Sequence, residues 1–365
     1  MLERDQVLAI YMEGHRADKS GKMGEGVLRY SSNPIACVID SGAADRDAAE
    51  VMRIPRHCPI VGTITEARAL GAQVLVLGIA PPGGRIPAAW LAAIDEAVAA
   101  GFSLVNGLHD LLAPRYQTLE PGQWVWDVRV EPPDLGIASG AAAGSAARRV
   151  LLVGTDMAVG KMTAALELHA AALARGLRSH FVATGQIGIT IVGRGVPLDA
   201  IRLDFASGAI EREVLAAGDA EIVFVEGQGS LLHPASSATL PLLRGTMPTH
   251  LVLCHRAGQA HLERVPSVTI PPLAQVIELY RDLAAACGAF PRPLVPCVAL
   301  NTSHVASDGD ARRAADAIER DLGLPCDDPL RHGAGRLLES LLSTPGRKYG
   351  DAPRTPMRRA RKARD

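Results

Sequence analysis

Residues 150–163 read VLLVGTDMAVGKMT and decide the fold of the second half of the chain. An apolar run ends at Gly154, five residues separate this glycine from Gly160, and Lys161 opens a helical stretch that continues to Ala174. Glycines let a backbone curl so that successive N–H groups point at one anion, and a helix start and a lysine add positive charge there. The strand, the glycine-bounded loop and the helix together predict a phosphate-binding loop.

Two features of this loop depart from the common pattern GxxxxGK[ST]. Five residues rather than four separate the glycines, and Met162 occupies the position where a hydroxyl binds Mg²⁺. Thr163 follows one residue later, where the helix has turned its side chain by about 100°. The sequence predicts a site that binds phosphates without splitting them, with a purely structural turn as the alternative. We expect the cofactor-binding residues to be Gly154, Thr155, Asp156, Val159, Gly160, Lys161, Met162 and Thr163.

The rest of the chain alternates short apolar runs with helical stretches. Strands are expected at residues 36–39, 74–77, 103–105, 180–183, 221–225, 250–253 and 295–300. Helices are expected at residues 64–70, 88–100, 209–217, 273–287 and 311–321. Continuous β-branched runs are typical of strands that are buried on both faces of a parallel sheet. The pattern predicts an α/β fold class, with parallel sheets covered by helices.

The length of 365 residues predicts two domains. A stretch rich in Gly, Ala and Ser at residues 138–149 is expected to be a linker, which gives predicted domains over residues 1–137 and 150–345. Residues 346–365 hold eight Lys and Arg against two Asp, so this segment carries +6 and the rest of the chain −7. We expect a basic disordered tail, with a contact to RNA, DNA or anionic lipid as the less favoured alternative.

Composition also narrows the class of protein. No apolar run reaches the 18 residues or more of a membrane span, and the charged N-terminus lacks the apolar core of a signal peptide, so a cytoplasmic location is expected. The six cysteines have no CxxC spacing, which predicts reduced structural thiols and no metal site. A small-molecule substrate is the expected partner, without nucleic acid or membrane, and a homo-oligomer is common among α/β enzymes of this size.

A second motif lies at residues 221–234, which read EIVFVEGQGSLLHP. An apolar strand ends at Glu226, and a Gly-Gln-Gly turn follows it. Residues at the carboxyl ends of strands line the ligand crevice of open α/β sheets, so Glu226 and Gln228 are candidate site residues. His233 precedes Pro234 and is equally compatible with a catalytic base and with a residue that orients the loop.

The string GTDxxVGK and its five-residue spacing resemble dethiobiotin synthetase, an ATP-dependent carboxylating ligase. In that ligase the string VEG places a glutamate near Mg²⁺, and here VEG is found at residues 225–227. One hypothesis for the chain is therefore an ATP-dependent ligase, which would need Mg²⁺ and ATP. A nucleotide-binding P-loop protein without turnover is a further alternative.

More strings, in the same order, resemble another family over nearly the whole chain. They are GVLRYSS (26–32), LGIAPPGGRIP (77–87), NGLHDLL (106–112), WDVRVEPPDL (126–135), GTDMAVGKMTAALEL (154–168), VATGQIGITIVGRGVPLDAIRLDFASGAIE (182–211), VEGQGSLLHP (225–234), ALNTS (299–303) and GLPCDDPLR (323–331). The family was catalogued as a domain of unknown function and is named for D-glutamate N-acetyltransferase. That enzyme moves an acetyl group from acetyl-CoA to the amine of D-glutamate. The resemblance implies a Rossmann-like N-terminal domain followed by a P-loop NTPase-like domain.

The chain departs from the usual strings of this family in three places, one of which is residues 41–50 (SGAADRDAAE), where a stretch rich in Gly and Lys is usual. Met157 stands where cysteine is common, and Ile187 stands where threonine is common. Both lie in strings that the resemblance assigns to the site. They bear on the identity of the substrate.

The resemblance also implies roles for individual residues. Acetyl-CoA is the expected co-substrate, with its phosphates on the loop at residues 156–163 and Lys161 as the main charge. Asp156, Asp204 and Glu226 are candidate bases; Glu226 is preferred, and Asp204 is equally able to cap or pair structurally. The expected catalytic residues are Glu226, Asp204 and Lys161.

The acceptor side of the reaction has its own candidates. Backbone N–H groups at residues 184–188 suit an oxyanion or a substrate carboxylate. Arg129 can grip a carboxylate in bidentate fashion, and a surface pair with Asp127 is equally expected. The expected substrate-binding residues are Gln186, Gly188, Gln228, Gly229 and Arg129.

Overall fold

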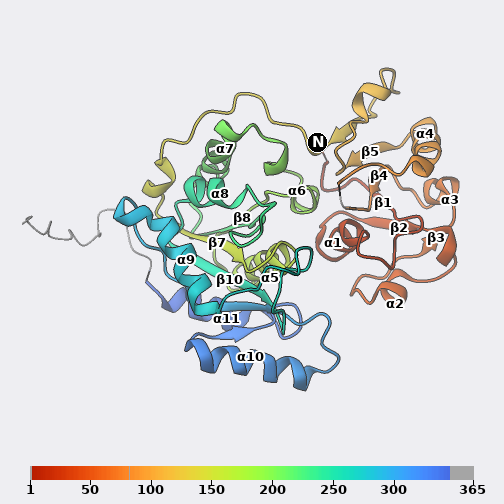
Figure 1. Ribbon diagram of the computed structural model, residues 1–365. Coiled ribbons are helices and arrows are strands. Elements are labelled where there is room, and N and C mark those ends of the chain that lie inside the picture. The colour runs from red at the N-terminus through yellow and green to blue at the C-terminus, as the bar shows by residue number, and fades with distance from the viewer. Residues whose placement is uncertain (1, 82, 346–365) are drawn as a thin grey trace, which may run out of the picture. The chain divides into compact units, whose positions relative to one another are not determined.

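The computed structural model describes residues 2–81 and 83–345, and its strands form two sheets (Figure 1). The first sheet has the strand order β3-β2-β1-β4-β5-β6, and the second has the order β12-β11-β10-β7-β9-β8. The strands pair in parallel, and helices connect them along the chain. The predicted α/β fold class is confirmed.

Short apolar segments form the first sheet. Its strands are β1 (Leu8–Tyr11), β2 (Ile35–Ile39), β3 (Ile60–Val61), β4 (Val74–Leu77), β5 (Ser103–Asn106) and β6 (Val125–Asp127). The α-helices of this part are α1 (Lys22–Tyr30), α2 (Ala48–Met52), α3 (Ile64–Ala69) and α4 (Leu91–Ala99). Three 3₁₀ turns accompany them: η1 (Ser41–Ala43), η2 (Ala88–Trp90) and η3 (Ala113–Arg115).

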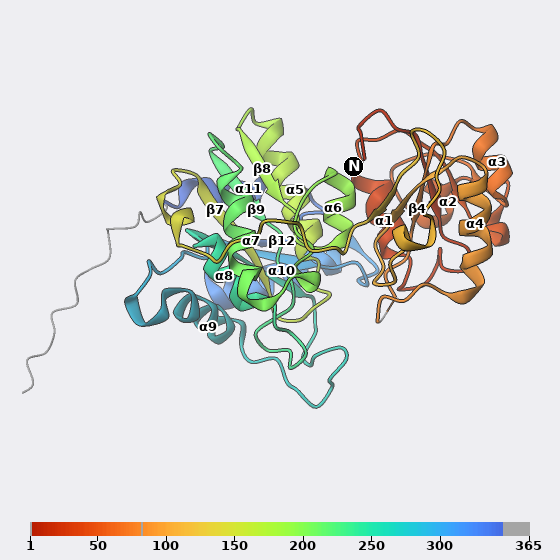
Figure 2. The ribbon, with the colours of Figure 1, turned by 90° about the horizontal axis from the view of Figure 1, so that it is seen from above.

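Alternation along β1 distributes its side chains between the two faces of this sheet. Tyr11 belongs to the buried cluster that includes residues of α3 and α4, and its ring meets Trp90 edge to face at 4.5 Å between centroids. On the side of α1, Met12 packs so closely on Gly24 that a Cβ there would lie 2.3 Å from its sulfur. Figure 2 shows α1 on one side of these strands and α3 and α4 on the other.

Longer strands form the centre of the second sheet. Its strands are β7 (Arg148–Gly154), β8 (Ser179–Val182), β9 (Ile222–Val225), β10 (His250–Arg256), β11 (Val298–Asn301) and β12 (Cys326–Asp327). The α-helices of the second half are α5 (Lys161–Ala174), α6 (Gln186–Val192), α7 (Leu203–Leu215), α8 (Thr239–Thr246), α9 (Leu273–Ala285), α10 (Asp308–Leu322) and α11 (Gly335–Ser343). The 3₁₀ turns are η4 (Ala141–Gly144), η5 (Leu198–Ala200) and η6 (Ala286–Gly288).

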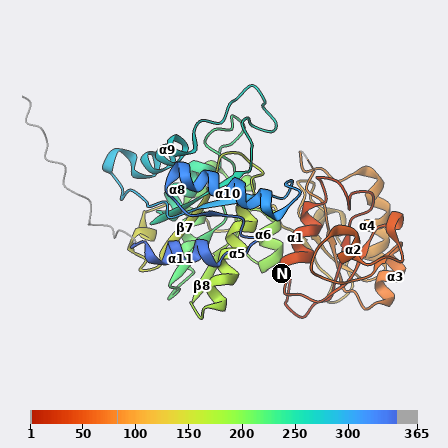
Figure 3. The same cartoon turned by 90° about the horizontal axis from the view of Figure 1, so that it is seen from below.

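The pair β7 and β10 positions the phosphate loop. The two strands run in register from Val150 opposite His250 to Gly154 opposite Cys254, and their residues are almost all buried. Helices α5 and α11 pack against each other on one face, and α8 and α9 lie on the other (Figure 3). Burial on both faces accounts for the continuous apolar runs in the sequence.

Contacts divide the described residues into two compact units. One comprises residues 2–138, 181–216 and 225–228, and the other comprises residues 139–180, 217–224 and 229–345. The predicted linker at residues 138–149 contains η4 and the start of β7. The predicted domain limits at 137 and 150 stay predictions, and the predicted basic tail at residues 346–365 lies outside the described residues.

No helix within residues 2–81 and 83–345 has the length and apolar character needed to cross a membrane.

Candidate functional site

The two glycines of the phosphate loop are required by the geometry of the structure. A Cβ on Gly154 would lie 2.7 Å from Cγ2 of Val159. Gly160 precedes α5 with a φ of +93°, and a Cβ there would lie 3.3 Å from Nδ2 of Asn301. Glycine adopts this left-handed conformation at no steric cost. The five-residue spacing therefore forms a tight turn between β7 and α5.

Lys161 is the first residue of α5, and its side chain bends back over the loop. The residue is 4% exposed, and Nζ donates to the carbonyl oxygens of Asp156 and Met157, at 2.8 Å each. Met162 and Thr163 follow and are half-buried. A helix start and a buried ammonium thus coincide, as an anion site requires.

Asp156 organises the loop from within. Its Oδ1 accepts from the backbone N of Met157 at 2.7 Å, and its Oδ2 accepts from Gln259 Nε2 at 2.7 Å and from the backbone N of Glu263 at 2.8 Å. Burial acts to raise the pKa of Asp156, but these hydrogen bonds outweigh it and the pKa is lowered. An ionised carboxylate with these donors orders the loop.

Residues distant in the sequence complete the support of the loop. His255 follows Cys254 in β10, and its Nδ1 lies 2.9 Å from Oγ1 of Thr155. Burial lowers the pKa of His255 to about 4, so its ring is neutral at pH 7. The Tyr280 hydroxyl donates to the Gly154 carbonyl oxygen at 2.8 Å. His255 lies two residues beyond the strand predicted at residues 250–253, because β10 continues to Arg256. Neither its contact with the loop nor that of Tyr280, on α9, had a signal in the sequence.

Glu226 lies directly after β9 and is 3% exposed. Its Oε2 accepts from the backbone N–H groups of Thr184 at 2.9 Å and Gly185 at 3.1 Å. The Thr184 hydroxyl donates to the Glu226 carbonyl oxygen at 2.8 Å, and Gln228 Nε2 lies 3.2 Å from that hydroxyl. Three of the predicted site positions, Glu226, Gln228 and the turn at residues 184–188, therefore form one cluster, which we call the Glu226 cluster.

Two glycines of this cluster are needed because Glu226 and Gln228 pack on them. A Cβ on Gly185 would lie 2.5 Å from Gln228 Nε2, and one on Gly188 would lie 2.5 Å from Glu226 Oε2. The N–H groups of Thr184 and Gly185 were expected to bind a substrate carboxylate or an oxyanion. In the structure the carboxylate of Glu226 accepts both of them.

Arg129 and Gln186 meet at Gly107. Arg129 Nε donates to the Gly107 carbonyl oxygen at 2.8 Å, and a Cβ on Gly107 would lie 3.3 Å from Cγ of Gln186. The guanidinium also contacts His109 Nε2 at 2.5 Å and pairs with Asp199. The expected pairing of Arg129 with Asp127 is wrong.

Asp127 has a different role from the predicted one. Its carboxylate accepts from the backbone N of Leu112 at 3.0 Å and of Ala113 at 2.9 Å, and from Asn106 Nδ2 at 2.8 Å. These hydrogen bonds hold the chain segment that follows β5 in place. Arg129 therefore pairs with Asp199 instead, whose own side chain is about half exposed.

Two other predicted site residues have mainly structural surroundings. Asp204 is exposed in the first turn of α7, where a negative charge stabilises the helix start. Gly229 has a φ of +67°, and a Cβ there would lie 1.8 Å from Oγ of Ser236. The structure therefore favours the structural alternative for Asp204. Close packing against Ser236 explains why position 229 is a glycine.

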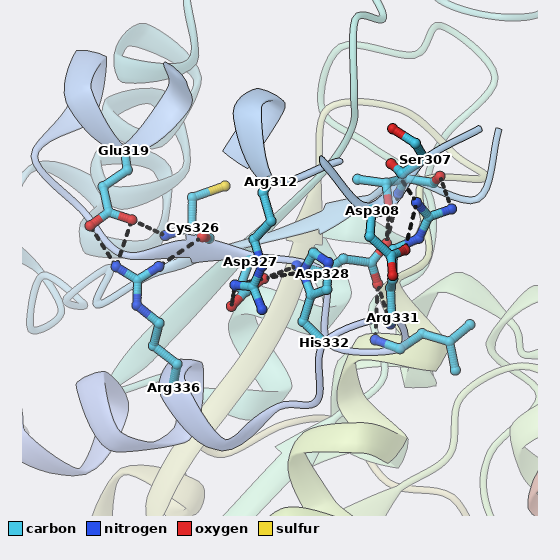
Figure 4. A network of polar contacts seen from close by, with 12 residues as sticks. Ser307, Asp308, Arg312, Glu319, Cys326, Asp327, Asp328, Arg331, His332 and Arg336 are labelled. Atoms are coloured by element: carbon cyan, nitrogen blue, oxygen red, sulfur yellow. Dashed lines mark hydrogen bonds and ion pairs between the residues drawn. The ribbon is translucent and has the colours of Figure 1, made fainter. Parts of the chain in front are cut away.

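A polar network after β11 and β12 was missed by sequence reasoning (Figure 4). Asp327 accepts from His332 Nδ1 at 2.7 Å, and Asp328 Oδ2 accepts from the backbone N of Thr302 at 2.9 Å. Arg331 donates to the carbonyl oxygens of Val305 and Ser307, at 2.7 and 3.0 Å. This network fixes the chain that follows Asn301, which is the neighbour of Gly160.

Over the part of the chain that the structure describes, no three His, Cys, Asp or Glu side chains are grouped as a metal site.

Comparisons with protein families and solved structures agree with this architecture. Residues 41–131 match the Rossmann-like domain described as a domain of unknown function, DUF1611_N, and residues 136–338 match the P-loop domain DUF1611_C. The crystal structure of a DUF1611 family protein from Anabaena variabilis is 48% identical, covers 93% of this chain and 100% of its own, and has a TM-score of 0.89.

Two curated relatives carry the name of an activity. D-glutamate N-acetyltransferase from Tritonibacter scottomollicae is 38% identical, and its counterpart from a Pseudoalteromonas species is 36% identical. Each alignment covers 76% of this chain and 84% of the relative. The chain belongs to the DUF1611 family, with a Rossmann-like N-terminal domain and a P-loop C-terminal domain.

Proposed function

We propose that the chain is an N-acetyltransferase that moves an acetyl group from acetyl-CoA to the amine of a D-amino acid, with D-glutamate as the expected acceptor. The observation that carries the proposal is the likeness to two relatives named D-glutamate N-acetyltransferase, at 38% and 36% identity. The phosphate loop supports it, because Met162 replaces the hydroxyl that binds Mg²⁺ in nucleotide-splitting loops.

The phosphate loop binds the phosphates of acetyl-CoA in this proposal. CoA carries a diphosphate and a 3′-phosphate, so it needs an anion site even though no phosphate is transferred. The start of α5 supplies backbone N–H groups and the positive end of a 14-residue helix. Lys161 supplies the full charge, and its ammonium is already held at the loop by two carbonyl oxygens.

Arg129 binds a carboxylate of the acceptor. Its side chain is 9% exposed and its guanidinium is fixed by the Gly107 carbonyl oxygen, so it is oriented before a substrate arrives. Its present partner, Asp199, is 47% exposed, so a substrate carboxylate can compete for the same guanidinium. Gln186 lies beside Gly107 and adds an amide for hydrogen bonding to the acceptor.

Acetyl transfer is then an aminolysis of the acetyl-CoA thioester. A base removes one proton from the substrate ammonium, the amine attacks the thioester carbonyl carbon, and the C–N bond forms as the C–S bond breaks. The sulfur leaves as a thiolate, which takes up a proton to give free CoA. Glu226 is our proposed base, because its buried carboxylate is oriented by two backbone N–H groups.

A thiol-release assay tests the proposal. Purified protein is mixed with acetyl-CoA and with D- or L-glutamate, aspartate or alanine, with and without EDTA. We expect free thiol and N-acetylated product with D-glutamate, at the same rate in EDTA. The absence of thiol with every amino acid, together with ADP formation from Mg-ATP, would instead identify an ATP-dependent ligase.

A further inference from the structure

His233 lies in a short segment, residues 229–236, that is closed on itself. The backbone N of Ser230 donates to Ser236 Oγ at 3.0 Å, and the backbone N of Ser236 donates to the His233 carbonyl oxygen at 3.0 Å. The left-handed Gly229 fits against Ser236, where no side chain has room. The segment is therefore held in one conformation, and that conformation determines where the ring of His233 lies.

A buried tyrosine joins this segment to the phosphate loop. The Tyr280 hydroxyl donates to the Gly154 carbonyl oxygen at 2.8 Å and accepts from the backbone N of Leu231 at 3.1 Å. Tyr280 is 1% exposed, and burial raises its pKa, so the hydroxyl keeps its proton. One side chain thus bonds the end of β7 and the segment that carries His233.

The hydrogen bonds of His233 assign its tautomer. Its Nδ1 accepts from the backbone N of Ala235 at 3.1 Å. A neutral imidazole carries a single N–H, so the proton is on Nε2. The residue is 6% exposed, and Nε2 is one of the buried side-chain atoms of the described residues that have no hydrogen-bond partner. A buried donor without an acceptor is unfavourable, and such a group needs a partner that a ligand can supply.

The surroundings of His233 identify what kind of partner is missing. The ring lies within electrostatic reach of the Asp156 carboxyl in the phosphate loop. Asp156 itself already accepts from the backbone of Met157 and Glu263 and from the amide of Gln259. A buried N–H donor on a segment that Tyr280 bonds to the end of β7, where the phosphate loop begins, matches an oxygen of a phosphate bound by that loop.

We propose that His233 is a ligand-binding residue of the phosphate loop, whose Nε2–H donates to a phosphoryl oxygen of the diphosphate bound there. The inference rests on the proposed function for the identity of that diphosphate, which is the one in acetyl-CoA. It also separates the two ring nitrogens by role. Nδ1 holds the segment in place, and Nε2 is a donor and not a catalytic base.

Two substitutions separate the nitrogens experimentally. His233→Asn keeps an acceptor near the position of Nδ1 and removes the Nε2 donor. His233→Gln places an amide donor near the position of Nε2 and removes the Nδ1 acceptor. CoA, ADP and inorganic pyrophosphate are titrated by calorimetry in EDTA into the full-length wild type and both variants, and the thermal stability of each is measured without ligand.

We expect H233N to weaken the binding of all three probes about tenfold or more, as for a lost hydrogen bond to a charged group. H233Q should bind them within about threefold of the wild type, although it loses more thermal stability than H233N. The reverse order, with binding lost in H233Q and kept in H233N, would overturn the inference. Failure of the wild type to bind any of the three probes would overturn it as well.

The outcome is separable from that of the proposed function. Binding of ADP and pyrophosphate that is weakened in H233N, with no binding of CoA and no thiol release, would uphold His233 as a diphosphate ligand. The same result would refute the acetyl transfer.

Discussion

The starts of helices α5 and α6 are built alike but differ in charge. Each follows a strand and a glycine-containing turn, and each has polar side chains packed against that turn. At α5 the side chain that bonds to the turn is Lys161, whose ammonium donates to two carbonyl oxygens of the loop. At α6 the side chain that bonds to the turn is Glu226, whose carboxylate accepts hydrogen bonds from the backbone N–H groups of Thr184 and Gly185.

This difference favours the start of α5 over that of α6 for the external anion that the proposed function requires. A carboxylate within the turn satisfies the donors of α6 and adds a negative charge, so a second anion there is repelled. A lysine adds to the positive end of the α5 dipole and attracts one. The expectation that residues 184–188 bind an anion followed from their glycines alone. It did not take account of Glu226.

The largest expected effect is that of Glu226→Gln. If Glu226 is the base, kcat for acetyl transfer falls by about 10³-fold, within the range typical of general bases. The amide keeps the shape of the side chain, so KM for acetyl-CoA stays within about twofold. Thiol release checks both parameters, and Asp204→Asn, at an exposed carboxylate on α7, is the matched control. Wild-type kcat in E226Q would reduce Glu226 to a structural anchor of α6.

The second prediction concerns pH and the support of the phosphate loop. The pKa of His255 is about 4 in the folded chain, against about 6.5 when unfolded. Between these values the unfolded state binds a proton that the folded state does not, so stability falls as pH falls from 6.5 to 4, by up to about 3 kcal/mol. Urea unfolding of His255→Gln should lack this loss. His57→Gln, at an exposed histidine, should retain it, and equal slopes in both variants would contradict the assignment.

The third prediction tests the cation of the α5 start. Lys161→Ala should raise the Kd of CoA by about 10- to 100-fold, as expected for a lost charged hydrogen bond. Calorimetry in EDTA measures the Kd, and Lys19→Ala, at an exposed lysine, is the control. An unchanged Kd would remove the loop from the CoA site and with it the contrast between the two helices.

The smallest effect is expected at the α6 start. A methyl group at Gly188 would lie 2.5 Å from Glu226 Oε2, so Gly188→Ala must displace that carboxylate. We expect the free energy of unfolding to drop by about 1–3 kcal/mol, with a parallel loss of kcat. Gly144→Ala, where a Cβ meets nothing within 4 Å, is the control. If the two variants were equally stable and active, the packing of Glu226 on this turn would not matter.

Local patterns in the sequence were enough to predict much of the fold. The strand predicted at residues 74–77 has the same limits as β4, and α5 ends at the predicted residue, Ala174. Both limits depend on residues that are neighbours in the sequence. Helix α1 was missed, since Gly24 and Gly26 lower its helix propensity. The structure shows why Gly24 is there: Met12 occupies the space that a side chain would need. Tertiary packing overrides local preference at this position.

The candidate site likewise has parts that could be predicted from local sequence and parts that could not. The phosphate loop is continuous in sequence, so its spacing and its lysine could be predicted. The partners of Asp156 are 103 and 107 residues away, at Gln259 and Glu263, and no local signal connects them. Arg129 was predicted from its own motif, but its pairing with Asp199 joins residues that lie 70 apart in the chain. Long-range contacts of this kind are fixed by the fold and not by a motif.

The contrast between the two helix starts is tested most directly by titrating CoA, in EDTA, into isotope-labelled protein and following backbone amide resonances. We predict that the amides of Gly160, Lys161 and Met162 shift with saturation, while those of Thr184 and Gly185 stay bonded to Glu226 and hardly move. Saturable shifts at Thr184 and Gly185, with none at the start of α5, would contradict the account.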